Sequence, residues 1–279
     1  MKKIVLGIFM VFVVGCTNDD KSGNDNNSST ILIKKIITNY GRDNYLSMFS
    51  YNGNKISEIK NYGDYYLSSK EVFTYTGDLI TKIIKTEFNN TGPNDDTQTE
   101  TFLEYDIYGK IILETILYDS GTSEKIYYNY GQNGTITTTS INNIIGQNIN
   151  YPYYPSSTSY AFSDNLLVND TKTYVISNSY EDISNNTYIY DNKNSPYKNI
   201  VGFNALFSNP SRQKHNLLKL INKTTYKDNI SNILSTNSTT TLIEYYYNSE
   251  GYPTESYSNE SYDFIDGGWS NFYFTEYIY

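Results

Sequence analysis

A short phrase recurs along this chain: two aromatic residues, two positions apart, run into a turn glycine, and an isoleucine-rich segment follows. Copies with a tight turn end at Gly53 and Gly77, and copies with a looser turn end at Gly109, Gly134 and Gly251. Aromatic residues at positions i and i+2 of a strand share one face, and glycine readily adopts the left-handed backbone that tight turns need. Each phrase therefore predicts two antiparallel strands joined by a short turn.

A sixth copy has Asn194 where the others have glycine. After glycine, asparagine is the residue that best tolerates the left-handed conformation, so we expect a turn there as well. Pro196 and Pro253 each follow the turn position by two residues. Because proline has no N–H to donate to a sheet ladder, we expect a strand to begin at each proline or to lie at a sheet edge.

The isoleucines that follow the first two turns are three residues apart, as Ile56 and Ile59 are, and again Ile80 and Ile83. This spacing also occurs on helix faces, but these segments are short, β-branched and closely bounded by turns. We therefore expect strands with a β-bulge or a strong twist rather than helices.

Three stretches interrupt the hairpin pattern. Residues 86–100 predict a long exposed hairpin loop, and residues 141–165 contain an unusual Tyr-Pro-Tyr-Tyr-Pro run. Residues 202–221 form the one segment with helical spacing, which predicts short amphipathic turns that plug or cap one end of the sheet. The apolar residues with this spacing are Phe203, Leu206, Phe207, Leu217, Leu218, Leu220 and Ile221. The expected fold is thus all-β, an antiparallel meander of successive hairpins forming a curved or partly rolled sheet, with one or two short helices around residues 202–221.

The composition agrees with a β-sheet and argues against a nucleic-acid partner. Tyrosine occurs 32 times, and asparagine, serine, threonine and isoleucine are abundant, which favours pleated surfaces and turns. The formal charge is −9 and becomes −11 without Lys2 and Lys3, so no basic face is expected to bind phosphates. The roughly 250 residues from Ile31 to Tyr279 suffice for one sizeable core, and we expect a single domain at residues 31–279.

Residues 1–15 have the layout of a signal peptide. Lys2 and Lys3 precede an apolar run from Ile4 to Val14, which is too short to cross a hydrocarbon core of ~30 Å as a helix. The run ends in Val-Val-Gly before Cys16, the only cysteine in the chain. This tetrapeptide resembles the lipobox of bacterial lipoproteins, which implies a diacylglycerol on the Cys16 sulfur and removal of the leader. A buried cysteine behind a hydrophobic helix is the alternative reading of these residues.

Residues 16–30 are expected to be a disordered tether. From Thr17 to Thr30 the segment has no apolar residue, so it cannot bury enough surface to offset its ordering entropy. A random coil of this length reaches on the order of 20 Å. Asp19 and Asp20 resemble the acidic export signal of Bacteroidetes-type lipoproteins. This resemblance implies a lipid-anchored protein of the outer membrane, displayed on the cell surface rather than facing the periplasm.

Two of the phrases carry a wider family resemblance. The segment from Tyr245 to Pro253 reads Tyr-x-Tyr-x-x-x-Gly-x-Pro, and the segment from Tyr188 to Pro196 follows the same pattern. Such phrases, over most of residues 45–279, resemble the degenerate YD/RHS-like repeats of Bacteroidetes surface lipoproteins of unknown function. The resemblance implies a sheet of successive hairpins on an envelope lipoprotein. The uneven spacing of the phrase glycines argues against a regular closed spiral.

The residues offer little for catalysis or for a cofactor. His215 is the only histidine, and we expect it to be a surface or helix-start residue with no role as a base or ligand. No P-loop, nucleophile elbow or zinc-protease motif occurs. The acidic stretches at residues 94–96 and 191–194 lack the ligand spacing of a calcium loop and are read as solvated turns, so neither a metal nor a cofactor is expected. Glu104, Glu114 and Glu244 stand at alternating strand positions and are expected to point outward into solvent.

Aromatic residues in loops are the best candidates for binding. Tyr151, Tyr153, Tyr154 and Trp269 lie near prolines or a Gly-Gly pair, where exposed rings could stack on a glycan or anchor a protein partner. Each could instead be a packing residue, and Trp269 could start a closing strand over Asn271 to Tyr279. We expect a non-catalytic binding or structural surface module. The alternatives are a carbohydrate-active enzyme with two carboxylates about 5–10 Å apart, and a periplasmic carrier with an apolar cavity.

The lipid anchor can be tested at its attachment point. Cys16→Ser removes the sulfur that would carry the lipid, so we expect the variant to stay unprocessed or to leave the membrane fraction. Membrane fractionation and immunoblotting measure this, with the neighbouring Thr17→Ser as the control. Unchanged membrane partition of Cys16→Ser would contradict the anchor.

Overall fold

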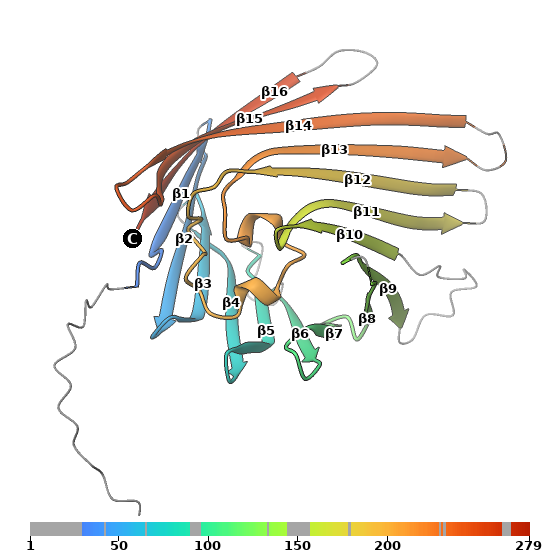
Figure 1. Ribbon diagram of the computed structural model, residues 1–279, viewed down its shortest axis with the longest axis horizontal. Coiled ribbons are helices and arrows are strands. Elements are labelled where there is room, and N and C mark those ends of the chain that lie inside the picture. Colours follow the sequence, from blue (N-terminus) through green and yellow to red (C-terminus); the bar gives the residue numbers. More distant parts are fainter. Residues whose placement is uncertain are drawn as a thin grey trace, which may run out of the picture.

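The strands form one continuous antiparallel sheet that closes on itself as a barrel (Figure 1). The computed structural model describes residues 30–41, 43–64, 66–89, 96–132, 134–143, 157–177, 180–228, 230, 233–263 and 269–279. Within this part of the chain each strand pairs with the next along the sequence, and β1 pairs with β16. The expected meander is therefore confirmed, but the sheet is more closed than the partly rolled form that the sequence predicted.

The strands are β1 (Lys35–Tyr40), β2 (Asp43–Asn52), β3 (Lys55–Gly63), β4 (Tyr66–Thr76), β5 (Leu79–Glu87), β6 (Thr97–Tyr105), β7 (Ile111–Tyr118), β8 (Ser123–Tyr130), β9 (Ile136–Asn143), β10 (Ser157–Ser163), β11 (Leu166–Ser177), β12 (Tyr180–Tyr190), β13 (Leu217–Asp228), β14 (Ile233–Tyr247), β15 (Pro253–Asp263) and β16 (Trp269–Ile278). Two short 3-10 helices, η1 (Phe203–Ala205) and η2 (Pro210–Arg212), lie in the connection between β12 and β13. The closing ladder runs from Lys35 opposite Ile278 to Asn39 opposite Phe274. Closure leaves no free sheet edge in the ladder.

The two ends of the barrel differ. The connections that follow the even-numbered strands meet at one end, together with the first described residues and the C-terminal Tyr279. The phrase glycines lie in these turns and have positive φ, between 57° and 77°, at Gly53, Gly77, Gly109, Gly134 and Gly251, which confirms the turn prediction. We call this the plugged end, because the segment between β12 and β13 fills it. The odd-numbered strands end at the opposite end of the barrel, which we call the mouth.

The three-residue spacing of the isoleucines has the expected cause. Ile56 lies opposite Tyr51, while Glu58 lies opposite Ser50, so Ser57 is an extra residue in β3. Because the bulge restarts the alternation, Ile56 and Ile59 both point into the barrel, where they are 0% and 4% exposed. The hairpin of β4 and β5 has the same register shift, which confirms the prediction of bulged strands.

Tyrosine hydroxyls link neighbouring hairpins at the plugged end. Tyr105 Oη donates to the carbonyl of Ile80 at 2.6 Å, and Tyr130 Oη donates to the carbonyl of Ile111 at 2.8 Å. Ile80 and Ile111 each stand beside the bulge of the preceding hairpin, where the ladder is disrupted. Burial raises the pKa of Tyr105 and of Tyr130 to about 12, so both hydroxyls keep the proton that they donate. The recurrent tyrosine thus fills the interior with its ring and pairs a backbone carbonyl with its hydroxyl.

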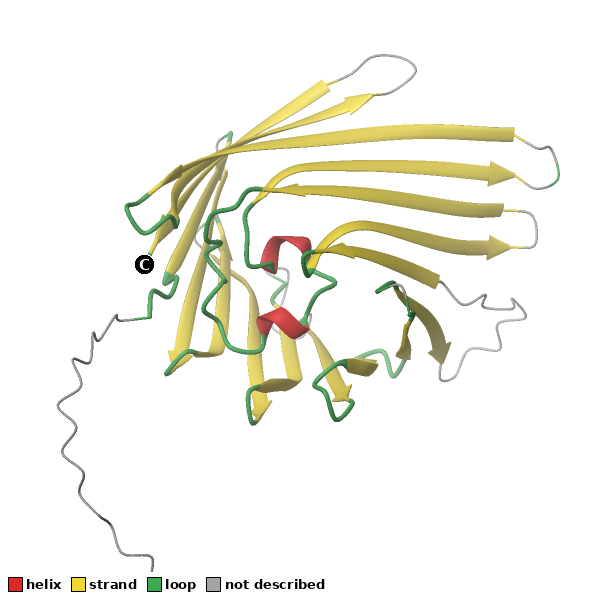
Figure 2. Cartoon of the chain, in the orientation of Figure 1, coloured by secondary structure: helices red, strands yellow, loops and turns green. Residues whose placement is uncertain are grey.

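Residues 191–216, which we call the plug, lie inside the ring of strands (Figure 2). Phe203 is 1% exposed, and Phe207 makes edge contacts with three rings of the wall. The wall rings around Phe207 are Tyr128, Tyr160 and Phe162, with centroid distances of 5.4–5.8 Å. Tyr75 Oη donates to the carbonyl of Val201 at 3.1 Å, which ties the plug to β4. The expected plugging segment is therefore present, and aromatic packing holds it.

The helical expectation was wrong for the second half of residues 202–221. Leu217 and Leu220 belong to β13, and both pair with residues of β12. A bulge places Lys219 opposite Ile189 and Leu217 opposite Tyr190, so Leu218 is the extra residue. Two inward leucines three positions apart thus imitate helical spacing. Only η1 and η2 are helical in the described part of this region.

The prediction of a hairpin turn at Asn194 was also wrong. Asn194 does not have a positive φ, and no strand begins at Pro196, because the chain enters the plug there. The Asn194 side chain instead donates to the carbonyl of Glu250 at 2.8 Å, which fixes the plug to the neighbouring turn. Pro253 does begin a strand, β15, as expected.

The loops predicted between strands are shorter than expected where they can be described. β5 extends to Glu87 and β6 begins at Thr97, so strands occupy both ends of residues 86–100, where the sequence predicted a long loop. The candidate residues Tyr151, Tyr153 and Tyr154 lie outside the described residues, as does Cys16.

The tyrosine link predicts a measurable loss of stability. Tyr105→Phe keeps the ring and leaves the Ile80 carbonyl without its donor, so the free energy of unfolding should fall by about 1–2 kcal/mol. Urea unfolding measures the change, and Tyr108→Phe, whose side chain is 80% exposed, should have no effect. Equal stability of the Tyr105→Phe variant and the wild type would show that the hydroxyl does not contribute to the free energy of unfolding.

Candidate functional site in the barrel lumen

The outer face of the barrel is charged. Because Ile59 is buried inside, the neighbouring Glu58 and Lys60 point outward, and they pair at 2.8 Å. Lys82 and Glu100 pair at 2.9 Å across β5 and β6 on the same face. The same alternation places these further charged residues outside: Lys35, Lys70, Glu104, Lys125, Glu181, Lys219, Lys223, Lys227, Glu244, Glu255 and Glu276.

Such an outer face suits water rather than lipid. A basic side chain at the lipid-facing midplane of a barrel costs roughly 2–4 kcal/mol. Outward charged residues stand on β1, β3 to β6, β8 and β12 to β16, so charges interrupt the outer face over most of the described wall. As expected, Glu104 and Glu244 point outward and are exposed.

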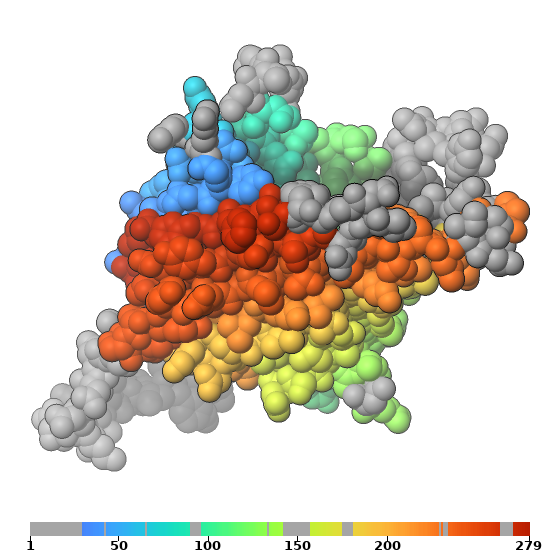
Figure 3. Space-filling model, turned by 90° about the horizontal axis from the view of Figure 1, so that it is seen from above, coloured from blue at the N-terminus to red at the C-terminus, as the bar shows by residue number. Residues whose placement is uncertain are grey.

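Exposed apolar side chains also occur on several parts of the outer face, and one group of them lies on the side formed by β14, β15 and β16. Figure 3 looks onto this side, where these strands lie next to one another. Leu242, Tyr257 and Phe272 are 51%, 48% and 66% exposed and border a groove of about 340 Å³. Glu244 and Asn259 line the same groove, so the patch is mixed rather than continuously apolar.

The inner face changes from apolar to polar along the barrel. Near the plug the wall carries the buried core, which includes Ile56, Ile80 and Phe203. Toward the mouth, a cavity of about 740 Å³ lies between β4–β7 and the plug. Its lining is formed by Glu71, Ile83, Lys85, Glu87, Thr97, Gln98, Thr99, Thr101, Ile116, Tyr118, Asp119, Ser120 and Arg212. This cavity has the volume of a typical ligand site, and most of the side chains that line it are polar or charged.

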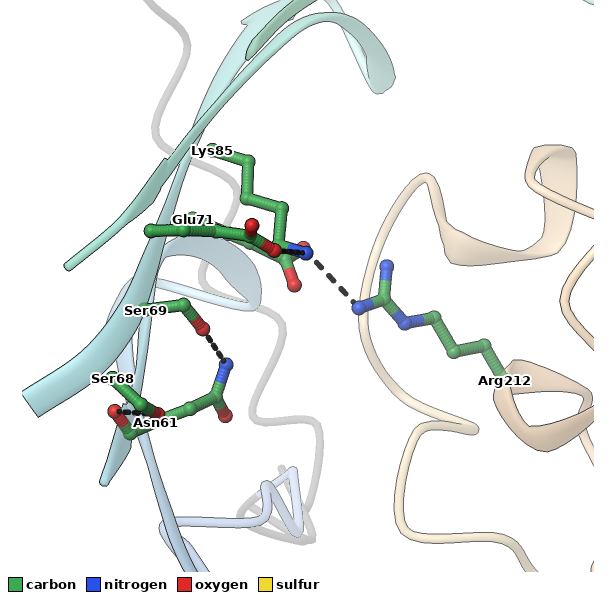
Figure 4. A network of polar contacts seen from close by, with 7 residues as sticks. Asn61, Ser68, Ser69, Glu71, Lys85 and Arg212 are labelled. Atoms are coloured by element: carbon green, nitrogen blue, oxygen red, sulfur yellow. Dashed lines mark hydrogen bonds and ion pairs between the residues drawn. The ribbon is translucent and has the colours of Figure 1, made fainter. Parts of the chain in front are cut away.

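An ion pair connects the plug to this wall. Arg212 reaches from η2 to Glu71 on β4, with Nη2 and Oε2 3.2 Å apart (Figure 4). The two side chains are only 20% and 16% exposed, so solvent screens the pair less than a surface pair. Lys85, which lies opposite Glu71 in the ladder, pairs with Glu87 at 2.5 Å. Both cations of the cavity therefore have a carboxylate partner.

A second cavity of about 220 Å³ lies on the other side of the plug. Tyr197 of the plug faces Tyr245 and Tyr277 of the wall there, with Ser256 beside them. Tyr277 and Ser256 share a hydrogen bond at 3.1 Å. Burial raises the pKa of Tyr197 to about 12 and also raises that of Tyr277. The phenols of this cavity thus remain neutral hydrogen-bonding groups.

The outward expectation for Glu114 was wrong. Glu114 lies opposite the buried Leu103 and points inward, because the bulge at Ile112 reverses the alternation in β7. Tyr128 Oη donates to its carboxylate at 2.8 Å. Burial raises the pKa of Glu114, the hydrogen bond from Tyr128 lowers it, and the charge of Glu124 raises it, with a net upward shift.

A second inward-pointing carboxylate stands on β11. Asp170 of β11 is 8% exposed and accepts hydrogen bonds from Tyr188 at 2.5 Å and Asn186 at 2.9 Å. Asn222 extends this network to Asn186 at 2.7 Å. Burial, followed by the hydrogen bond to Asp170, raises the pKa of Tyr188. These paired groups fix the inner wall in one arrangement.

Three further residues that the sequence analysis considered, Asp191, His215 and Trp269, lie within the described ranges and have structural roles there. Asp191 accepts hydrogen bonds from the backbone N–H and side-chain amide of Asn216, both at 3.0 Å, and from Tyr247, so its carboxylate holds the base of the plug. His215 lies in a bend of the plug rather than at a helix start, with Nδ1 2.6 Å from the carbonyl of Lys193. Trp269 begins β16, and its backbone pairs with Tyr262.

The cavity residues were missed by the sequence analysis. Arg212 and Glu71 are 141 positions apart, and no local pattern connects them. Thr97, Thr99 and Thr101 do show strand alternation, which could have marked one polar inward row.

The described ranges contain neither a cluster of metal ligands nor a helix that could span a membrane. No group of three or more histidine, cysteine, aspartate or glutamate side chains there could hold a metal ion. Among the helices of those ranges, none has the length and apolar character needed to cross a membrane.

Comparisons with known proteins found similarity in structure but none in sequence. No family model matches the chain, and no curated protein matches it in sequence. A porin-like protein from Bacteroides vulgatus is similar in structure, with 14% identity, a TM-score of 0.45, and coverage of 89% of this chain and 98% of that one. A porin-like protein from Bacteroides uniformis shows 11% identity and a TM-score of 0.47, with 88% and 97% coverage.

The raised pKa of Glu114 predicts a pH-dependent effect of removing its charge. A raised pKa means that the folded state favours the neutral carboxyl, so this contribution is present at low pH and is lost as the pH rises through the folded pKa. Glu114→Gln should therefore increase the free energy of unfolding at pH 7, and the gain should shrink toward pH 4. Urea unfolding at both pH values measures this, with the outward Glu104→Gln as the control. A gain that is equal at both pH values would contradict the raised pKa.

Proposed function

We propose that this chain is a non-catalytic binding protein of the cell envelope, attached to the outer membrane by a lipid on Cys16, which takes a ligand into its lumen. The observation that carries the proposal is the pairing of a charged outer wall with a polar internal cavity of about 740 Å³. A barrel with a water-facing exterior needs another means of membrane attachment, which the leader and Cys16 supply.

The position of the first described residues supports this arrangement. Ile33 is fully buried at the plugged end, where its carbonyl accepts a hydrogen bond from Tyr51 at 2.7 Å. Asn199 of the plug donates to the carbonyl of Ile31 at 2.8 Å. A tether that precedes Ile31 would therefore leave from the plugged end, and the mouth would face away from the attachment point. The acidic pair Asp19 and Asp20 favours the cell surface over the periplasmic face, which protease shaving of intact cells tests.

The alternative functions are less compatible with the lumen. A carrier of an apolar ligand needs a continuous apolar cavity, whereas polar and charged side chains interrupt the lining of the large cavity. A glycosidase needs a pair of available carboxylates. Glu71 is engaged by Arg212, and Glu114 by Tyr128, which supports binding without catalysis.

Single cysteines test whether the lumen binds. A lipid on Cys16 leaves no free thiol, so Thr99→Cys in the cavity and Thr74→Cys on the outer face can each be labelled selectively in the detergent-extracted full chain. We expect a small charged thiol reagent to reach both positions. A ligand held in the lumen should then slow the labelling of Thr99→Cys and leave that of Thr74→Cys unchanged.

Three probes cover the main ligand classes: maltohexaose, inorganic phosphate and palmitate. Protection of Thr99→Cys by at least one of them supports a binding lumen. Protection by none of the three, or equal slowing at both positions, would overturn the proposal.

A further inference from the structure

We infer that the ligand of the large cavity is a neutral oligosaccharide that lies along the inner face of β6, an inference that rests on the proposed binding role. The cavity presents three features together: a row of free hydroxyls, charges that neutralise one another, and a few apolar side chains. Each feature narrows the class of ligand.

The row of hydroxyls belongs to Thr97, Thr99 and Thr101. These residues alternate along β6 and point inward with the buried Leu103. Within the described ranges, none of the three hydroxyls has a hydrogen-bond partner in the protein, whereas nearby inward groups such as Asn61 and Ser69 bond each other at 3.0 Å. A threonine hydroxyl can donate one hydrogen bond and accept two, so the row matches a ligand that carries many hydroxyls.

The charges of the cavity do not favour an ionic ligand. Arg212 and Lys85 are paired with Glu71 and Glu87, and the remaining charged residue of the lining is Asp119. The carboxylate of Asp119 accepts a hydrogen bond from the backbone N–H of Gln98. A phosphate or carboxylate ligand would therefore meet no unpaired cation here, and the chain as a whole is negative.

The apolar side chains of the lining are few. Ile83 and Ile116 face the cavity from strands on either side of β6, and Tyr118, which is 39% exposed, offers its ring near the mouth. These groups suit the C–H faces of sugar rings, which combine an apolar face with a polar rim.

The cavity is large enough for a chain of several sugars and opens toward the mouth. Its volume of about 740 Å³ lies within the usual range of small-molecule sites. It extends from Arg212 on the plug to Ser120 in the turn between β7 and β8. A linear oligosaccharide could thus enter from solvent and displace ordered water along β6.

Calorimetric titration of the detergent-extracted full chain tests the ligand class. The neutral probes are maltohexaose, cellohexaose and mannohexaose, and the comparison probes are trigalacturonate, inorganic phosphate and palmitate. Thr99→Val and Thr101→Val remove one hydroxyl each at constant shape, and each should weaken binding of a neutral probe about 2- to 10-fold per lost hydrogen bond. Thr74→Val on the outer face is the matched control and should bind like the wild type.

The outcomes separate this inference from the proposed function. Binding of a neutral oligosaccharide that Thr99→Val and Thr101→Val weaken and Thr74→Val does not supports it. If phosphate or palmitate protects Thr99→Cys from labelling and no neutral probe binds, the inferred ligand class is wrong, but the proposal that the lumen binds a ligand stands. Binding of a neutral probe that none of the three variants changes overturns the position on β6. Absence of binding by all three neutral probes overturns the inference.

Discussion

Closure of the antiparallel ladder between β1 and β16 is the constraint on which the rest of the structure depends. In a closed ladder every strand has two neighbours, so each side chain points either into the lumen or out to the surroundings. The outward positions carry pairs such as Glu58 with Lys60, while the inward positions carry the aromatic and hydroxyl groups. The plug fills one end of the resulting space and leaves a polar cavity open toward the other. The proposed lipid anchor rests on the charged outer face, and the proposed lumen site rests on the polar groups of the inner face.

The local features of the barrel could be predicted from sequence, because they depend on residues close together in the chain. The phrase glycines marked the turns, and the spacing of Ile56 and Ile59 marked a bulge. One turn was missed: Asp164 and Asn165 join β10 and β11 with φ of 52° and 62°, and this Asp-Asn pair lacks the glycine on which the search relied. At Asn194 a hairpin turn was predicted that is not there. An asparagine side chain can hold a loop in place by a hydrogen bond as well as form a turn.

The wrong predictions about side-chain direction and helical spacing share a physical cause. A bulge reverses the inward and outward alternation, and its position cannot be read from a single strand, so Glu114 was placed outside although it lies in the lumen wall. Leu217 and Leu220 imitated helical spacing for the same reason. Closure and the cavity depend on contacts between distant parts of the chain, such as Arg212 with Glu71. The sequence therefore predicted the hairpins but neither the closed barrel nor the site inside it.

We expect the outer wall to face water even when the protein is bound to a membrane. Spin labels on Lys60→Cys, Lys125→Cys and Lys223→Cys probe three different sides of the outer face. With the lipid-modified protein in vesicles, collision rates with a water-soluble nickel complex and with oxygen can be compared at each position. All three labels should then collide freely with the nickel complex. Labels shielded from nickel and accessible to oxygen would place the wall in lipid and contradict this expectation.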